Sequence, residues 1–246
     1  MNITVNELAE RIGGKVQGDG QQQVRHCAAL DHAEGHDVVL VHTTEDLAAL
    51  TDSKAGVVVT SEALAKKVSG RVLVLAQDPR HAYRQALVEL HGFRNHPDPG
   101  IHAQAFVDST AIVGELCTIR PFAYLARHSR IGKRCVIYPH CYIGKNTSIG
   151  DDCVIYPGVS IYEGCILGNR VVVHSGSVIG HDGTVFVEHE DRRLRLPSAG
   201  NVVVEDDVEI GANCTLQRAI VGSTLIAKGV RLQDRCTVDQ GTVVAH

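Results

Sequence analysis

Residues 131–161 read IGKRCVIYPHCYIGKNTSIGDDCVIYPGVSI, with isoleucine at every sixth position. The same step of six continues in both directions, and all fourteen positions that it reaches from Ile101 to Ile179 hold Ile, Leu or Val. An α-helix repeats about every 3.6 residues and a coiled coil about every seven, so neither explains this period. A chain that turns a corner in each hexad, and sends one aliphatic side chain inward from each side, does explain it. The repeat therefore predicts a parallel β-helix with three sides to each coil.

A second position of the hexad, four residues after the aliphatic one, is usually small. Seven of the eight cysteines fall there, namely Cys117, Cys135, Cys141, Cys153, Cys165, Cys214 and Cys236. A free cysteine packs as a small apolar residue, so we expect these thiols to fill corners of the coils, reduced and buried. Cys117, Cys135 and Cys153 are eighteen residues apart and should stack in one column. The His and Cys residues within 26–36 fit no standard zinc spacing, so no metal is expected.

The period breaks in the polar and charged residues 181–201. It resumes at Val204, slips by four residues near Val221 and ends at Val244. We expect this segment to be a loop inserted at a corner, where a rigid solenoid commonly carries its function. Its basic side chains suit either a solvated loop or a clamp for a phosphate group, and the sequence leaves both interpretations open for Arg192, Arg193 and Arg195.

Residues 1–98 lack the hexad and alternate helical and strand signals. The capping box of Thr4 and Glu7 predicts the start of one helix, and Asp78-Pro79 predicts the start of another. Apolar runs predict buried strands at 38–41, 57–59 and 72–75. We therefore expect a small α/β domain over 1–98 and an all-β solenoid over 99–246, with a polar linker at 95–100.

Composition excludes several classes of protein. The net charge of −4 argues against a nucleic-acid binder, which carries a basic surface. The sequence contains no run of about eighteen apolar residues, so no transmembrane segment is expected. The first residues lack the basic start and apolar run of a secretory signal. These features favour a cytoplasmic protein that binds no nucleic acid.

The chain contains ELAERIGGKVQGDG at 7–20, KAGVVVT at 54–60, VHSGSVIGHDG at 173–183 and RLPSAGNVVVEDDVEIGANCTLQRA at 195–219. The first two stretches resemble the uridine-binding domain of the UDP-3-O-acylglucosamine N-acyltransferase family of lipid A biosynthesis. The other two resemble that family's coils on either side of its inserted loop. The resemblance implies a homotrimer of left-handed β-helices with active sites in clefts between subunits. It also implies transfer of a 3-hydroxyacyl group from acyl carrier protein to the amine of a UDP-linked amino sugar. The donor carries the phosphopantetheine, and no cofactor or metal is implied.

The resemblance also suggests site residues. Substrate-binding positions would be Ser175, Gly176, Asp182, Gly183, Arg218 and Asp239. The family's catalytic histidine, in Ile-Ala-His-Asn, aligns with Gln240. Histidine is the usual base near neutral pH, and the candidates here are His174 and the terminal His246, one hexad after Gln240. The β-helix also contains His102, His128, His140 and His181.

Other positions depart from the family pattern. The aromatic residues that stack on uracil align with Leu40 and Asp46, and their neighbouring Asn aligns with Thr43. The family's Thr-Ile-Asp-Arg-Gly reads TLQRA at 215–219. The chain ends before the family's last coils and C-terminal helices, as a fragment or a shortened relative would.

Three functions remain open on this basis. The first is acyl transfer from acyl carrier protein to a UDP-linked amino sugar. The second is a non-catalytic relative that binds a ligand or a partner, which the glutamine at position 240 favours. The third is another hexapeptide acyltransferase, with acyl-coenzyme A as its donor.

Overall fold

A computed structural model describes residues 3–93 and 95–245. The chain divides into two compact units, Met1–Asn95 and His96–His246, so the division falls three residues before the expected boundary at 98. Within the described ranges, no helix is both long and apolar enough to cross a membrane.

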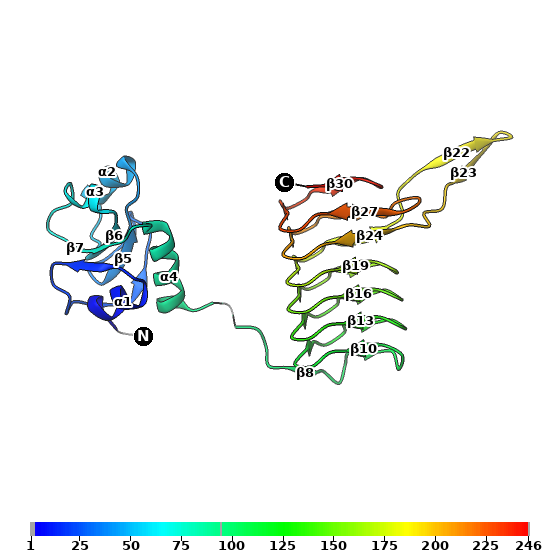
Figure 1. Cartoon of the computed structure of the whole chain (residues 1–246), viewed down its shortest axis with the longest axis horizontal. Helices are drawn as coiled ribbons and strands as arrows, with labels where there is room; N and C mark the ends of the chain where they lie inside the picture. The colour runs from blue at the N-terminus through cyan, green and yellow to red at the C-terminus, as the bar shows by residue number, and fades with distance from the viewer. Residues whose placement is uncertain (1–2, 94, 246) are drawn as a thin grey trace. The chain divides into compact units, whose positions relative to one another are not determined.

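The first unit is an α/β domain built on a five-stranded sheet (Figure 1). In sheet order its strands are β2 (Lys15–Gln17), β7 (Val72–Leu75), β6 (Val57–Thr60), β5 (Asp37–Leu40) and β4 (His26–Cys27). A separate antiparallel pair joins β1 (Ile3–Thr4) and β3 (Gln23–Val24). The helices are α1 (Val5–Arg11), α2 (Thr44–Asp52), α3 (Glu62–Ala65) and α4 (Pro79–His91). Both predicted helix starts and all three predicted strands are confirmed, and the Thr4–Glu7 capping box is present.

The second unit is the predicted parallel β-helix, with one seven-stranded sheet on each of three sides (Figure 1). One sheet contains β8 (Gly100–Ile101), β11 (Thr118–Ile119), β14 (Val136–Ile137), β17 (Val154–Ile155), β20 (Val172–Val173), β25 (Glu209–Ile210) and β28 (Arg231–Leu232). The second contains β9 (Phe106–Val107), β12 (Tyr124–Leu125), β15 (Tyr142–Ile143), β18 (Ser160–Ile161), β21 (Val178–His181), β26 (Thr215–Gln217) and β29 (Thr237–Val238). The third contains β10 (Ile112–Val113), β13 (Arg130–Ile131), β16 (Ser148–Ile149), β19 (Ile166–Leu167), β24 (Asn201–Val204), β27 (Ser223–Ile226) and β30 (Val243–Val244).

The hexad sets both the register and the core of this unit. Ile119 pairs with Ile137, so equivalent strands are eighteen residues apart and each coil holds three hexads. The aliphatic positions from Ile119 to Leu216 are buried in one continuous core. Ile101, at the end of the stack, is 55% exposed. The predicted inward direction of the aliphatic residues therefore holds wherever coils lie on both sides.

Most corners from Leu116 onward hold a residue in the left-handed backbone region, usually three positions after the aliphatic one. Side chains other than glycine occupy it at φ values near 60°, for example Arg134, His140 and Asp152. This conformation is unfavourable for such residues and needs support from the surrounding structure. The support is a hydrogen bond to the previous coil, such as that from Asp152 N to Lys133 O at 2.8 Å. His128 and His140, two of the histidines considered as bases, are exposed corner residues of this kind.

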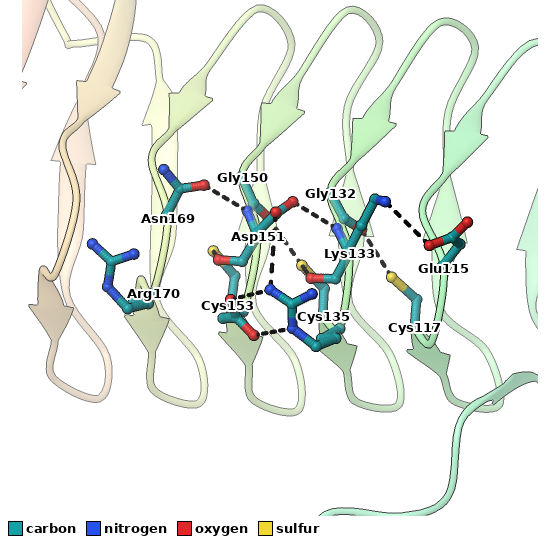
Figure 2. Close-up of polar contacts among 12 residues, drawn as sticks. Glu115, Cys117, Gly132, Lys133, Cys135, Gly150, Asp151, Cys153, Asn169 and Arg170 are labelled. Carbon is teal, nitrogen blue, oxygen red and sulfur yellow. Dashed lines mark hydrogen bonds and ion pairs between the residues drawn. The ribbon is translucent and has the colours of Figure 1, made fainter.

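Side chains at the small corner position both pack in the core and donate hydrogen bonds. Cys117 and Cys135 donate from Sγ to the carbonyl oxygens of Gly132 and Gly150, at 2.9 and 3.0 Å (Figure 2). Cys153 continues this column one coil further, and all three thiols are free and buried, as predicted. Thr147 and Ser177 occupy the same slot and donate to the next coil in the same way. The slot therefore holds a small S–H or O–H donor in these coils and an apolar side chain such as Val159 in others, so a purely apolar packing interpretation describes only part of it.

Opposite charges alternate along the neighbouring column (Figure 2). Lys133 Nζ lies 3.1 Å from Glu115 Oε2, and the Lys133 backbone N–H donates to Asp151 Oδ1 at 2.8 Å. Beside them, Arg134 donates two hydrogen bonds of 2.6 Å to the carboxylate of Asp152. Because these pairs are exposed, water and salt screen them, and they fix the register of the coils more than they stabilise the fold.

The inserted segment is a β-hairpin that projects from the β-helix (Figure 1). Its strands are β22 (Phe186–His189) and β23 (Arg192–Arg195), and every residue in both is exposed. The Arg193 guanidinium lies 5.1 Å from the centre of the Phe186 ring. β21 ends at His181 and β24 begins at Asn201, so the excursion from the coils spans 182–200.

Candidate functional site

The polar groups of the candidate site gather where the inserted hairpin leaves the second sheet. β21 pairs with β26 in register at Ile179 and Leu216, and a β-bulge then brings His181 opposite Gln217. β29 follows β26 in the same sheet, and Gln240 lies two residues after its end. Three successive coils therefore bring their residues together at one corner of the β-helix. We call this corner the loop base, and it consists of residues 181–183, 217–218 and 240.

Arg218 holds the start of the hairpin in place. Its side chain is only 7% exposed, and its Nε donates to the carbonyl oxygen of Gly180 at 2.6 Å. Nη2 donates to the backbone oxygen of Glu163 at 2.8 Å, and Nε lies 3.6 Å from Asp182 Oδ1. The backbone N–H of Arg218 also donates to the carbonyl oxygen of His181 at 3.0 Å. Arg218, expected to contact substrate, is already bonded to protein groups and fixes the backbone of the loop base.

Gly183 closes over two glutamine side chains. A Cβ atom on Gly183 would lie 2.8 Å from Gln217 Oε1 and 2.7 Å from Gln240 Oε1. Gly183 is buried, and its φ lies outside the left-handed region, so the requirement for glycine here is one of space. Both amide oxygens therefore converge beneath the residue that follows Asp182.

Two polar atoms at the loop base are buried and have no hydrogen-bond partner. They are His181 Nε2 and Gln240 Oε1, and across the described part of the chain the only other such side-chain atom is Thr60 Oγ1, in the first unit. A buried polar atom without a partner is costly, and native proteins keep few of them. Both atoms belong to the loop base, so a polar ligand or water bound there could satisfy them.

His174, a candidate base, belongs to a different group of contacts on the first sheet. Its ring stacks on Tyr156 with centroids 5.0 Å apart, and its Nε2 lies 3.1 Å from Glu209 Oε1. Glu209 also bonds to Arg231. Ser175 and Gly176 form the exposed turn that follows. The contacts described for His174 are therefore with Tyr156 and Glu209, and not with residues of the loop base.

Only some of the site residues suggested by the family resemblance lie at the loop base. Asp182, Gly183, Arg218 and Gln240 come together there, and Asp239 is an exposed turn residue directly before Gln240. His246 lies outside the described residues. Sequence reasoning missed Glu163, whose contact with Arg218 spans 55 residues and leaves no local signal.

Grooves run beside the loop base and along the second sheet. One, of about 430 Å³, is lined by Asn146, Glu163, Asn201 and Arg218 among others. A second, of about 400 Å³, shares Glu163 and is lined by Asp108, Tyr124, Arg127, Tyr142 and Lys145. The two grooves thus form an elongated polar and aromatic surface that reaches the loop base, a shape suited to an extended ligand.

The residues that align with the family's uracil-stacking positions make structural contacts in the first unit. Asp46 Oδ2 accepts hydrogen bonds from the backbone N–H groups of His42 and Thr43, and Thr43 is the N-cap of α2. Leu40 ends β5 and is partly buried. A separate groove of about 560 Å³ in this unit is lined by residues that include Lys15, Ser61 and Glu62.

The repeat places the chain among hexapeptide-repeat transferases. The family model of the bacterial transferase hexapeptide (six repeats) matches residues 146–181. The model of the hexapeptide repeat of succinyl-transferase matches 128–163 and 201–245.

Comparison with whole proteins defines the family more narrowly. The chain is 47% identical over 231 residues to UDP-3-O-acylglucosamine N-acyltransferase of Syntrophotalea carbinolica, covering 94% of this chain and 66% of that protein. It is 42% identical over 246 residues to the enzyme of the same name from Syntrophus aciditrophicus, covering 100% and 68%. A solved structure of Arabidopsis UDP-N-acetylglucosamine acyltransferase is 21% identical with a TM-score of 0.41, covering 57% of this chain and 49% of that one. The chain belongs to the UDP-3-O-acylglucosamine N-acyltransferase family, and it spans about two thirds of the length of the curated relatives it matches.

Proposed function

We propose that this protein is an acyltransferase that moves an acyl group, such as a 3-hydroxyacyl group, from acyl carrier protein to the amine of a UDP-linked amino sugar in the cytoplasm. The proposal rests on membership of this family together with the residues found at the loop base. Asp182, Gly183 and Arg218 are kept there, and two buried polar atoms lack partners. An amine that attacks a thioester needs a hydrogen-bond acceptor to orient it and a base to remove its proton. The loop base offers acceptors in the amide oxygens of Gln217 and Gln240.

The elongated grooves support the donor half of the proposal. Phosphopantetheine is a long, flexible arm, and the two grooves that share Glu163 extend from Arg218 past Tyr142 to Asp108. Lys145 and Arg127 line the same surface and would attract a phosphate group. Both acyl carrier protein and acyl-coenzyme A present this arm, so coenzyme A remains an alternative donor.

A homotrimer is part of the proposal, in which a symmetry-related copy would cover the two grooves of each β-helix. The expected mass is about 80 kDa, three times the 26.5 kDa of the chain. Light scattering at micromolar concentration measures it. A stable monomer would contradict a site shared between subunits.

One observation favours a second candidate, a non-catalytic relative that binds a ligand. Gln240 stands where the family has its catalytic histidine, and Gln217 stands where the family has an aspartate. An amide cannot take a proton near neutral pH, so a site that relied on position 240 for its base would bind substrate without turning it over.

Steady-state transfer assays separate the candidates. The wild-type chain is incubated with UDP-linked amino sugar and either acyl carrier protein or acyl-coenzyme A as the thioester donor. The proposal predicts turnover with acyl carrier protein and a much lower rate with acyl-coenzyme A. Calorimetric binding of the sugar nucleotide without turnover, together with new activity in Gln240→His, would establish the non-catalytic relative instead.

A further inference from the structure

His181 occupies a rigid position at the loop base. The peptide groups on both sides of it bond to Arg218, since Gly180 O accepts from Nε at 2.6 Å and His181 O accepts from the Arg218 backbone at 3.0 Å. Its strand partner is Gln217, whose amide oxygen converges with that of Gln240 beneath Gly183. His181 is therefore the one imidazole built into this corner by the contacts described.

The two unpartnered atoms have complementary uses. With its proton on Nδ1, a neutral imidazole has a free lone pair on Nε2, and an amide oxygen always accepts. A neutral primary amine has two N–H bonds and one lone pair. An amine placed between the two atoms would donate one N–H to Gln240 Oε1 and the other to His181 Nε2, which would leave its lone pair free for attack. Such an amine would satisfy both of the atoms that have no partner in the structure.

We propose that His181 is the general base of this protein and that Gln240 orients the amine, an inference that rests on the proposed acyl transfer. The amine nitrogen attacks the thioester carbonyl carbon, a C–N bond forms, and the proton released from nitrogen moves to His181 Nε2. The C–S bond then breaks, and the leaving sulfur takes that proton as a thiol. His181 returns to its neutral form, and the products are an amide and a free pantetheine thiol.

The charged groups around His181 are consistent with this role. Asp182 and Glu163 both lie near the Arg218 guanidinium, at 3.6 and 3.5 Å, so each carboxylate is compensated by that cation. Neither is a free base. His174 contacts Glu209 and Tyr156 on the first sheet. Among the described titratable groups of the loop base, His181 is the one with a buried ring nitrogen, Nε2, that has no hydrogen-bond partner.

The test compares His181→Gln and His181→Asn with wild type and with His128→Gln, a control at an exposed corner. Loss of the base should lower kcat by about 10²–10⁴-fold and leave the KM for the sugar nucleotide nearly unchanged. The acid limb of the wild-type pH–rate profile, which reports protonation of the base, should disappear in both variants. Wild-type kcat with an unchanged pH profile in either folded variant overturns the proposal.

A second measurement on the wild-type chain does not depend on turnover or on how the variants fold. Titration of UDP-linked amino sugar into protein with ¹⁵N-labelled histidine rings should move the Nε2 resonance of His181 and leave that of His128 in place. Binding that leaves His181 unmoved overturns this inference while leaving the proposed function standing. Absence of both binding and turnover overturns the proposed function, and this inference with it.

Discussion

The Nε atom of Arg218 donates a 2.6 Å hydrogen bond to the carbonyl oxygen of Gly180, a residue 38 positions earlier in the chain. A Cβ on Gly180 would lie 2.3 Å from Cys165 Sγ, so only glycine brings this carbonyl close to the coil beneath. The contact fixes the point where the hairpin leaves the β-helix. The geometry of the loop base thus depends on a buried guanidinium rather than on the hairpin itself.

We expect Arg218→Lys to destabilise the protein. The ammonium group of lysine cannot bond to the carbonyl oxygens of Gly180 and Glu163 in the planar geometry that guanidinium provides. Loss of a charged hydrogen bond at this buried position should lower the free energy of unfolding by about 2 kcal/mol. Urea denaturation measures the change. Arg235→Lys, at an exposed corner, is the control, and an equal effect of both substitutions would contradict the role given to Arg218.

Gly183→Ala should reduce activity more than stability. The new methyl group would approach Gln217 Oε1 and Gln240 Oε1 to less than contact distance, and both side chains would have to move. Displacement of an orienting group by about 1 Å can cost about 100-fold in rate. The comparison is kcat and melting temperature against Gly35→Ala, where a Cβ meets nothing within 4 Å. Unchanged kcat in Gly183→Ala would show that the two amides do not orient the acceptor.

The corner cysteines should be inert in the folded protein. Burial raises the pKa of Cys141 to about 12 and that of Cys165 to about 11, so both are protonated thiols near pH 8, where the reactive thiolate is scarce. Native protein should therefore react slowly with a thiol reagent at these positions, and at Cys117, Cys135 and Cys153, which are also buried. Half-buried Cys236 should be labelled first. Mass spectrometry of labelled peptides identifies the sites, and rapid reaction of the buried thiols would contradict the register.

Acid should weaken the β-helix by a small amount, because it neutralises the exposed carboxylates of Asp152 and Asp207, which pair with arginines of the preceding coils. Hydrogen bonds from Arg134 lower the pKa of Asp152, and hydrogen bonds from Arg170 lower that of Asp207, both from an ordinary value of 3.8. A carboxyl group whose pKa is lower in the folded state stabilises that state above its unfolded pKa. The stabilisation is lost as the pH falls below 3.8 and through the folded-state values. The urea midpoint should decline in this range, and less so in Asp152→Asn. An identical decline in that variant would exclude this pair as a contributor.

The sequence predicted the β-helix because the constraint is local and repeated. Ile137 and Ile155 occupy equivalent buried positions in stacked coils, and each hexad repeats the same requirement. The hydrogen-bonding role of Cys135 was not predicted, because its acceptor, Gly150 O, lies on the following coil. Sequence periodicity shows which position is small, but it does not show what that position faces.

The candidate site was predicted only in part. Asp182, Gly183 and Gln240 were identified from their place in family motifs, yet their meeting depends on the bulge at His181 and on the Arg218 contacts. His181 stood in the sequence as one of several β-helix histidines with nothing to distinguish it. Burial of its Nε2 without a partner is a property of the folded corner.

The proposed function requires that this chain forms an amide bond although glutamine occupies the aligned base position. Mass spectrometry of the sugar nucleotide after incubation with acyl-loaded acyl carrier protein near neutral pH tests it most directly. We predict that the acceptor gains the mass of one acyl group, in a linkage that resists neutral hydroxylamine as an amide does and a thioester does not. Recovery of bound but unmodified sugar nucleotide, with the donor thioester intact, would contradict the claim and leave a ligand-binding relative.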